Sequence, residues 1–212
     1  MIENIETKRI LIVISSPSGA GKTSICKKLL ELDSELRPSI SVTTRKPRNN
    51  ETNGIDYIFI SKEDFEKKIS NSEFLEYANV FNNKYGTLAS STMDLLNKDY
   101  DVLFDIDWQG TQQLSQNNNN NILTIFILPP DKNEIERRLK KRETENSENI
   151  DIVNERMSKF EDELSHWKEY DYVVTNDNFD ECVSEILNII TAERKKRTRQ
   201  KFLFSKIRDL TK

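Results

Sequence analysis

The stretch Ser16-Pro17-Ser18-Gly19-Ala20-Gly21-Lys22-Thr23 decides the fold. It fits the phosphate-binding pattern G-x-x-x-x-G-K-[ST] at every defined position except the first, where serine stands. An apolar, β-branched run at 10–14 precedes it and predicts a buried strand, and apolar residues at helical spacing follow it at 24–30. In a strand–loop–helix order, the loop N–H groups and the helix N-terminus favour an anion at one place. The stretch therefore predicts a nucleotide phosphate site.

The residues that close this loop carry its chemistry. Lys22 is long enough to reach the β- and γ-phosphates, and the Thr23 hydroxyl suits Mg²⁺. Asp105 and Asp107 end an apolar strand predicted at 101–107, where a carboxylate helps to hold the ion directly or through water. We expect Thr23 and Asp105 to be the metal residues. The alternative, an ordinary glycine turn before a helix, does not explain the Lys-Thr pair.

Length and composition limit the class of protein. The 212 residues suggest a single domain, and 35% hydrophobic with 32% charged residues is typical of a soluble globular protein. The net charge of −4 gives no general attraction to nucleic acid. No apolar run approaches the roughly 18 residues that span a membrane, and residues 1–6 lack the apolar part of a signal peptide. Cys26 and Cys182 make no disulfide framework, so we expect a cytoplasmic protein with reduced thiols.

The rest of the chain predicts an α/β fold with a small second lobe. Short strands at 39–42 and 57–60, a helix at 62–69 capped by Ser61, and a hairpin of 74–78 with 82–87 predict a mainly antiparallel lobe. The hairpin turn is expected at Asn82-Asn83. Apolar strands at 101–107, 122–128 and 172–174 alternate with helical segments, including 133–170 and 179–196. This rhythm predicts a parallel sheet covered on both faces.

A basic loop predicts a second phosphate site. Arg45 and Arg48 flank Pro47, with Glu51 and Tyr57 shortly after them. A guanidinium offers a rigid fork of donors that matches a phosphate, and a tyrosine hydroxyl adds another donor. A protein with two phosphate sites has a reason to bring two phosphorylated molecules together. A solvated basic loop without a ligand is the alternative.

Taken together, these motifs resemble the guanylate kinase family, and its bacterial-type members most closely. The segments that carry the resemblance stand in the family's order at 16–23, 41–48, 53–59, 74–78, 85–87, 105–110 and 170–177. The resemblance covers residues 9–196 and implies a P-loop nucleoside monophosphate kinase fold with a five-stranded parallel sheet. It implies a core at about 8–40, 88–132 and 168–196, a GMP-binding lobe at about 41–87, a helical lid at about 133–167 and a basic tail at 197–212.

The resemblance also implies an activity and its residues. Family members transfer the γ-phosphoryl group of ATP to GMP, with Mg²⁺, in purine nucleotide metabolism. The implied catalytic residues are Lys22, Arg45, Arg138, Arg142 and Arg156, the last three from the lid. ATP would contact the loop from Ser16 to Thr23, with Asn176 near the adenine. The GMP phosphate would contact Arg45, Arg48, Tyr57 and Tyr85, with Glu51 beside them, and the guanine would contact Ser41, Glu76, Thr87 and Asp107.

The chemistry of guanine agrees with two of these assignments. Guanine presents N1–H and N2–H₂ as donors and O6 as an acceptor. The Glu76 carboxylate is able to accept from both donors, and the Thr87 hydroxyl is able to donate to O6. Adenine inverts this edge, so that AMP would leave a desolvated carboxylate poorly paired at about 1–3 kcal/mol per unmet group. We therefore expect selectivity for GMP over AMP.

Several features depart from the family pattern or stand outside it. Asn50 and Glu143 stand where the family usually has glycine, and the segment between Arg142 and Arg156 is about three residues longer than usual, which affects lid geometry more than the reaction. The basic stretch 194–201 is expected to be a solvated helix end, with an RNA or partner contact as the alternative. His166, the single histidine, is expected at the surface.

Other functions remain open at this point. A non-catalytic guanylate-kinase-like binding module would typically have lost the loop lysine, whereas Lys22 is present. A related sugar-phosphate kinase should lack the guanine readers, whereas Glu76 and Thr87 are present. A GTPase needs an Asn-Lys-x-Asp base reader, and Asn97-Lys98-Asp99-Tyr100 has the wrong register. The sequence leaves a monomer and a homo-oligomer equally open.

Overall fold

The central sheet is built around β1 (Leu11–Ser15), all of whose residues are buried. The computed structural model describes residues 9–48, 51–80, 82–117, 121–138, 150–200 and 203–212, without the side chains of 117, 150–156 and 204. The sheet has five strands in the order β2-β7-β1-β8-β9, and all its pairings are parallel. The other strands are β2 (Leu36–Pro38), β7 (Asp101–Asp105), β8 (Ile122–Leu128) and β9 (Tyr172–Thr175). The predicted parallel α/β core is confirmed, and β2 is an addition to it.

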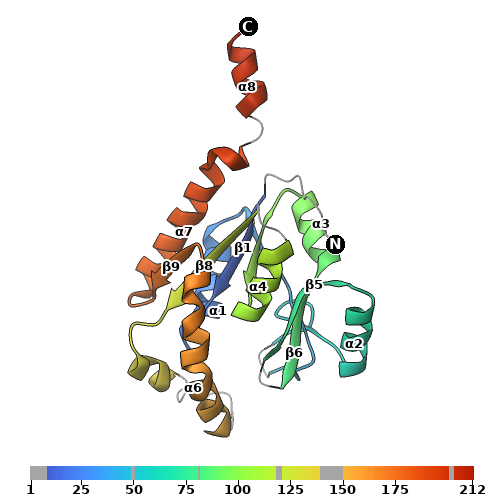
Figure 1. Cartoon of the computed structure of the whole chain (residues 1–212), viewed down its shortest axis with the longest axis vertical. Helices are drawn as coiled ribbons and strands as arrows, with labels where there is room; N and C mark the ends of the chain where they lie inside the picture. The colour runs from blue at the N-terminus through green and yellow to red at the C-terminus, as the bar shows by residue number, and fades with distance from the viewer. Residues whose placement is uncertain (1–8, 49–50, 81, 118–120, 139–149, 201–202) are drawn as a thin grey trace.

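Alternate side chains of β1 enter two different hydrophobic cores. Ile12 and Ile14 pack with α1 (Lys22–Leu32) and α7 (Phe179–Lys195) on one face of the sheet. Leu11 and Val13 pack on the other face, beneath α3 (Ala89–Asn97) and α4 (Trp108–Asn117). Figure 1 shows these helices on opposite sides of the sheet. Because successive strand side chains point to opposite faces, a continuously apolar strand must be covered twice.

A second sheet of four strands forms the small lobe, in the order β4-β3-β6-β5. Its strands are β3 (Val42–Thr43), β4 (Ile58–Phe59), β5 (Phe74–Val80) and β6 (Asn83–Leu88). The β3–β6 and β5–β6 pairs are antiparallel and β3–β4 is parallel, so the lobe is mainly antiparallel as expected. Helix α2 (Lys62–Ser70) packs on it, with Ser61 capping its N-terminus through the Asp64 N–H.

The hairpin turn lies one residue earlier than the sequence predicted. Asn83 already belongs to β6 and pairs with Val80. Asn82 carries the turn with a φ of 62°. Asparagine tolerates this left-handed conformation better than most residues do, so the first of the two asparagines is the one the turn requires.

The lid region and the C-terminal region complete the chain. Residues 132–138 are helical, and α6 (Ile150–Ser165) runs into a 3₁₀ turn at His166–Glu169. After α7, the 3₁₀ turn Arg197–Arg199 leads to α8 (Leu203–Leu210), which projects away from the rest of the molecule (Figure 1). None of the described helices is long and apolar enough to cross a membrane.

The basic stretch after α7 is less solvated than predicted. Arg194 donates to Asp101 and Asp33, both at 2.7 Å, and Asp101 is only 1% exposed. Arg199 donates to Glu193 at 3.1 Å and to the Ile122 carbonyl. Two of these arginines therefore anchor α7 to the sheet, which helical spacing alone does not reveal.

The Arg194–Asp101 pair leads to a stability prediction. Asp101 also accepts from the Ile10 N–H at 2.8 Å, so its carboxylate sits at the start of the central strands. Arg194→Ala leaves this buried charge without its cation, and we expect the free energy of unfolding to fall by about 3 kcal/mol. Urea unfolding measures the change. Lys195→Ala, at an exposed neighbouring position, is the matched control, and equal losses in both variants would contradict a specific role for the pair.

Candidate active site

The phosphate loop lies between the end of β1 and the start of α1, where the motif placed it. Residues Ser16 to Ala20 form the turn, and Gly21 caps α1 with a φ of 95°. A Cβ at Gly21 would lie 2.7 Å from the Asn176 amide nitrogen. Both the conformation and the space therefore require glycine at this position.

Asn176 holds this loop in place. Its side-chain amide donates to the Ala20 carbonyl at 2.7 Å, and the residue is only 3% exposed. Asn176 directly follows the edge strand β9, so this hydrogen bond ties the loop to the edge of the sheet. The sequence assigned Asn176 to adenine, and the loop contact was not foreseen because its partner is a backbone atom. The adenine contact stays a prediction.

A compact polar cluster lies where α1 begins and β7 ends. The Lys22 ammonium lies 3.0 Å from Asp105 and donates to the Ile106 carbonyl at 2.6 Å. The Thr23 hydroxyl donates to the other Asp105 oxygen at 2.9 Å. Burial lowers the pKa of Lys22, but the charge and hydrogen bond of Asp105 outweigh this and raise it above its usual value. Lys22 is therefore a permanent cation in the loop.

The basic loop forms a second polar cluster in the small lobe. The Arg45 guanidinium donates to both Glu51 oxygens at 2.9 and 2.8 Å, and its Nε donates to the Tyr85 hydroxyl at 3.1 Å. Glu51 also accepts from the Arg48 N–H at 2.8 Å. Burial raises the pKa of Glu51, but these bonds lower it by more, so the carboxylate is charged. The predicted phosphate residues are thus brought together, with Glu51 as the counter-ion of Arg45.

Tyr57 completes this cluster. Its ring packs edge-to-face on Tyr85, with 6.0 Å between centroids, and the Arg45 guanidinium lies 5.3 Å from its centroid. Burial raises the pKa of Tyr57 to about 12. Its hydroxyl is therefore protonated at neutral pH and is a hydrogen-bond donor for an anion.

Glu76 and Thr87 form a buried polar pair in which each side chain has an oxygen without a hydrogen-bond partner. They are direct neighbours on β5 and β6, and their exposed fractions are 3% and 0%. Within the described part of the chain, the Glu76 Oε1 and Thr87 Oγ1 atoms have no hydrogen-bond partner. Buried polar atoms are almost always paired in native proteins, so these two atoms are candidates to bind a polar ligand.

Gly110 in the first turn of α4 lies directly against the Glu76 carboxylate. A Cβ at Gly110 would lie only 2.4 Å from the Glu76 Oε2 atom. Any larger residue would therefore push the carboxylate out of its place. Gly110 belongs to the segment 105–110 that carries the family resemblance, but no role was predicted for it.

The two remaining residues assigned to guanine are Asp107 and Ser41. Asp107 accepts from the Gly110 N–H and from the Gln109 side chain, both at 3.1 Å. It therefore caps α4. Ser41 is nearly buried just before β3, where its carbonyl accepts from the Ile58 N–H. A contact of either residue with a base stays a prediction.

The lid residues divide into described and undescribed ones. Arg138 donates to Glu134 at 2.7 Å, and its Nη1 lies 3.4 Å from the Ala20 carbonyl. Arg138 thus already reaches the phosphate loop. Arg142 lies outside the described residues, as do Asn50 and Glu143. Arg156 lies on α6, and its side chain is not among those described.

Two side chains of the lid region make contacts that sequence reasoning did not foresee. Glu163 on α6 accepts from the Ser18 N–H of the phosphate loop at 2.9 Å. No motif marks such a contact, because one partner is a backbone group. The His166 ring stacks on Trp108 at 3.6 Å and its Nδ1 lies 2.6 Å from Glu169. The histidine is therefore half-buried rather than at the surface.

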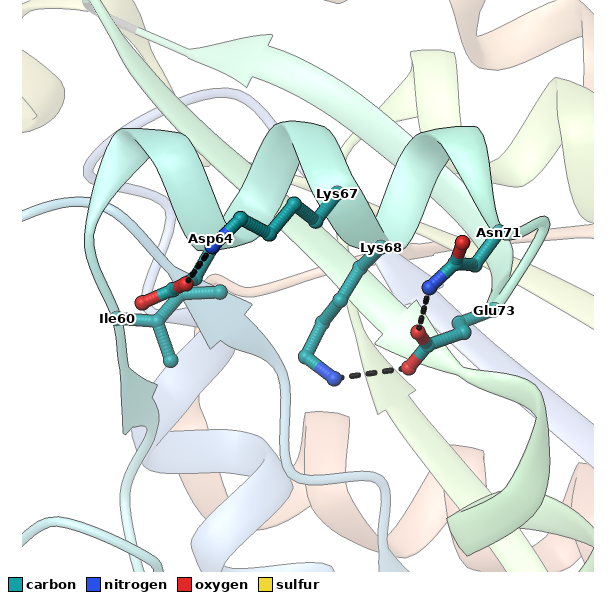
Figure 2. Close-up of a pocket in the computed structure, with 6 residues that line it drawn as sticks. All are labelled: Ile60, Asp64, Lys67, Lys68, Asn71 and Glu73. Carbon is teal, nitrogen blue, oxygen red and sulfur yellow. Dashed lines mark hydrogen bonds and ion pairs between the residues drawn. The ribbon is translucent and has the colours of Figure 1, made fainter.

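Two of the cavities among the described residues differ in their place in the fold. A cavity of about 140 Å³ lies between β5, the start of α4 and α6, and is lined by Asn79, Val80, Asp107, Trp108, Gln109, Lys159, Asp162 and Glu163. A shallower one of about 420 Å³ lies along α2. Figure 2 shows that its polar side chains bond to one another, Lys67 to Asp64 and Lys68 and Asn71 to Glu73. None of the residues that line it is among those predicted to bind a nucleotide.

Fold and site together define a P-loop protein with a second polar cluster around Arg45 and a buried Glu76–Thr87 pair. Comparison with known proteins gives the family. The family model described as "Guanylate kinase" matches residues 8–193. The guanylate kinases of Zymomonas mobilis and Rickettsia bellii are each 48% identical, over 90% and 91% of this chain and 87% and 98% of theirs. The crystal structure of guanylate kinase from Anaplasma phagocytophilum superposes with a TM-score of 0.78 at 35% identity, over 94% of this chain and 93% of that one. The chain belongs to the guanylate kinase family.

The Asn176 contact gives a prediction about the loop. Asn176→Ala removes the donor to Ala20, and we expect the affinity for ATP to fall about five- to tenfold, the usual effect of one lost hydrogen bond. Tripolyphosphate, which has no base, should lose affinity to the same extent, as measured by calorimetry. Asp177→Ala, at an exposed neighbouring position, should change neither. A loss confined to ATP would mean that Asn176 acts on the adenine instead.

The burial of Glu76 gives a prediction about pH. Burial raises the pKa of Glu76 from 4.5 to about 7. The nearby Asp107 charge acts in the same direction, whereas hydrogen bonds from Thr87 oppose the shift. An acid with a raised folded pKa contributes stability below its unfolded pKa and loses it as the pH rises through the folded value. Relative to Glu76→Gln, the wild-type free energy of unfolding should therefore fall by about 3 kcal/mol between about pH 4.5 and about pH 8. Urea unfolding of both proteins tests this, and parallel pH profiles would contradict it.

Proposed function

We propose a role for each of these residues in the guanylate kinase reaction. In that reaction, the γ-phosphoryl group of ATP passes to GMP, and the products are ADP and GDP. The activity follows from the family: the chain is an enzyme, an ATP:GMP phosphotransferase of nucleotide metabolism. The proposal concerns which residues bind ATP, which bind the GMP phosphate and which bind the guanine. Phosphoryl transfer needs little covalent help from the protein, so the work is positioning and neutralisation of charge.

The phosphate loop serves ATP. Its N–H groups and Lys22 surround the donor phosphates, and Arg138 reaches the same loop from the lid. Thr23 and Asp105 would hold Mg²⁺, since their oxygens are hard donors 2.9 Å apart and Mg²⁺ needs only one or two protein ligands beside substrate and water. When bound, the ion neutralises charge on the phosphates. Arg142 and Arg156 are proposed to join from the lid.

The Arg45 cluster serves the GMP phosphate. Arg45, Arg48, Tyr57 and Tyr85 supply guanidinium and hydroxyl groups within one small volume. Glu51 holds the Arg45 fork in its orientation before GMP arrives. An arriving phosphate then meets donors that are already ordered, which lowers the entropy lost on binding.

The unpaired Glu76–Thr87 pair serves the guanine, and this observation carries the substrate assignment. The two orphan oxygens match the donors and the acceptor on one edge of guanine. Binding of GMP satisfies both, whereas AMP would present an acceptor and a donor in the wrong places. Ser41 and Asp107 are proposed to complete the contacts.

The proposed parts of the single domain follow from these roles. The core at about 8–40, 88–132 and 168–196 binds ATP, the lobe at about 41–87 binds GMP, and the lid at about 133–167 covers both. We place the protein in the cytoplasm, in keeping with its two buried free cysteines, Cys26 and Cys182. ATP and GMP are the partners proposed.

Substrate selectivity tests the assignment. Glu76→Gln replaces one acceptor oxygen by a donor and removes the charge, so kcat/KM for GMP should fall about ten- to hundredfold. A coupled ADP-release assay with GMP, AMP, CMP and UMP measures this. Glu73→Gln, on an exposed ion pair with Lys68 near the same strand, is the control. Unchanged GMP turnover in Glu76→Gln would overturn the guanine assignment, and wild-type turnover of another nucleotide in preference to GMP would overturn the function.

A further inference from the structure

A carboxylate of the lid helix bonds directly to the phosphate loop. Glu163, three residues before the His166 turn on α6, accepts from the Ser18 N–H at 2.9 Å. Ser18 is the third residue of the loop motif, and 145 positions separate the two in sequence. The bond therefore connects a catalytic loop of the core with an element of the lid.

The Glu163 side chain lies among other charged side chains. It lines the cavity of about 140 Å³, with Asp107 on one side and Lys159 and Asp162 on its own helix. Burial raises the pKa of Glu163, opposed by the Ser18 bond and by Lys22. Removing a carboxylate partly from water costs free energy, and one backbone N–H offsets only part of it. A role for Glu163 beyond covering the surface would explain why this cost is tolerated.

We propose that Glu163 is a positioning residue that ties α6 to the phosphate loop and so sets where the lid stands over the reacting phosphates. The bond restrains both partners. It fixes the tip of the loop, whose amides face the phosphates, and it fixes the rotation of α6. Position 156 lies seven residues earlier on the same helix, hence on the same face. Holding Glu163 in place therefore also fixes where position 156, the site of a proposed catalytic arginine, lies relative to the phosphate loop.

This inference rests on the proposed function of the lid, and it predicts a particular kinetic pattern. A misplaced loop and lid should affect the transfer step and leave GMP binding intact, because Glu76 and Arg45 are on other elements. In Glu163→Leu, kcat should fall about ten- to hundredfold, the value of a hydrogen bond to a charged group. KM for GMP should change less than about twofold. Glu163→Gln keeps an acceptor oxygen without the charge and should recover most of kcat.

The experiment has a structural readout and a matched control. The Ser18 amide resonance in ¹H–¹⁵N spectra of the full chain reports the bond directly, and it should move in Glu163→Leu and remain near its wild-type position in Glu163→Gln. Asp162→Asn changes the neighbouring carboxylate in the same cavity and should leave both kcat and the Ser18 resonance unchanged. Thermal unfolding of each variant separates a loss of kcat from a loss of folded protein. If Glu163→Leu does not fold, Glu163→Ala, which also removes the acceptor, carries the test by the same resonance and the same kinetic split.

Three results would overturn the proposal. One is full kcat in Glu163→Leu, and another is a Ser18 amide that ignores the substitution. The third is a loss of GMP affinity as large as the loss of kcat, which would mean general damage. Each presupposes a wild-type enzyme that phosphorylates GMP. Failure of that activity would instead refute the proposed function.

Discussion

The ion pair between Lys22 and Asp105 is the interaction on which the site depends. It exists because β1 and β7 are parallel neighbours, with Ile14 opposite Asp105, so that the loop after one strand meets the carboxylate at the end of the other. Thr23 joins the same carboxylate. Parallel pairing therefore creates the donor site at the carboxyl edge of the sheet, where α/β proteins generally bind ligands.

The acceptor site depends on a different pairing. The antiparallel β5–β6 hairpin places Glu76 opposite Thr87 and removes both from water. Burying the Glu76 carboxylate with an unpaired oxygen costs free energy, and burial accordingly shifts its pKa toward neutrality. Functional sites commonly carry such local conflicts because a ligand resolves them. Gly110 preserves the position of the carboxylate, since a side chain there would meet it.

Local patterns in the sequence predicted the elements, and contacts with the backbone are what they could not predict. The strand–loop–helix unit around Lys22 and the helix after Ser61 follow from motif, periodicity and capping, and both are confirmed. Strand β2 was not predicted because it has only three residues, the last of them proline, which is too short for a strand pattern of alternating side chains. The bonds of Asn176 and Glu163 to the loop escaped because a backbone atom leaves no signature in the sequence. The nearness of Glu76 and Thr87 was implied only by family resemblance, since cross-strand register is not a local property.

The cationic groups of the site share one arrangement. Lys22 is paired with Asp105, Arg45 with Glu51 and Arg138 with Glu134. Each carboxylate orients its partner and limits the repulsion between cations in the absence of nucleotide. A nucleotide phosphate group carries more charge than one carboxylate and offers more acceptor oxygens, so it competes well for the same donors. The protein therefore holds its arginines and lysine ready without leaving them unpaired. In the proposed function, nucleotide binding is an exchange of anions at ordered donors, which costs less conformational entropy than ordering free side chains would.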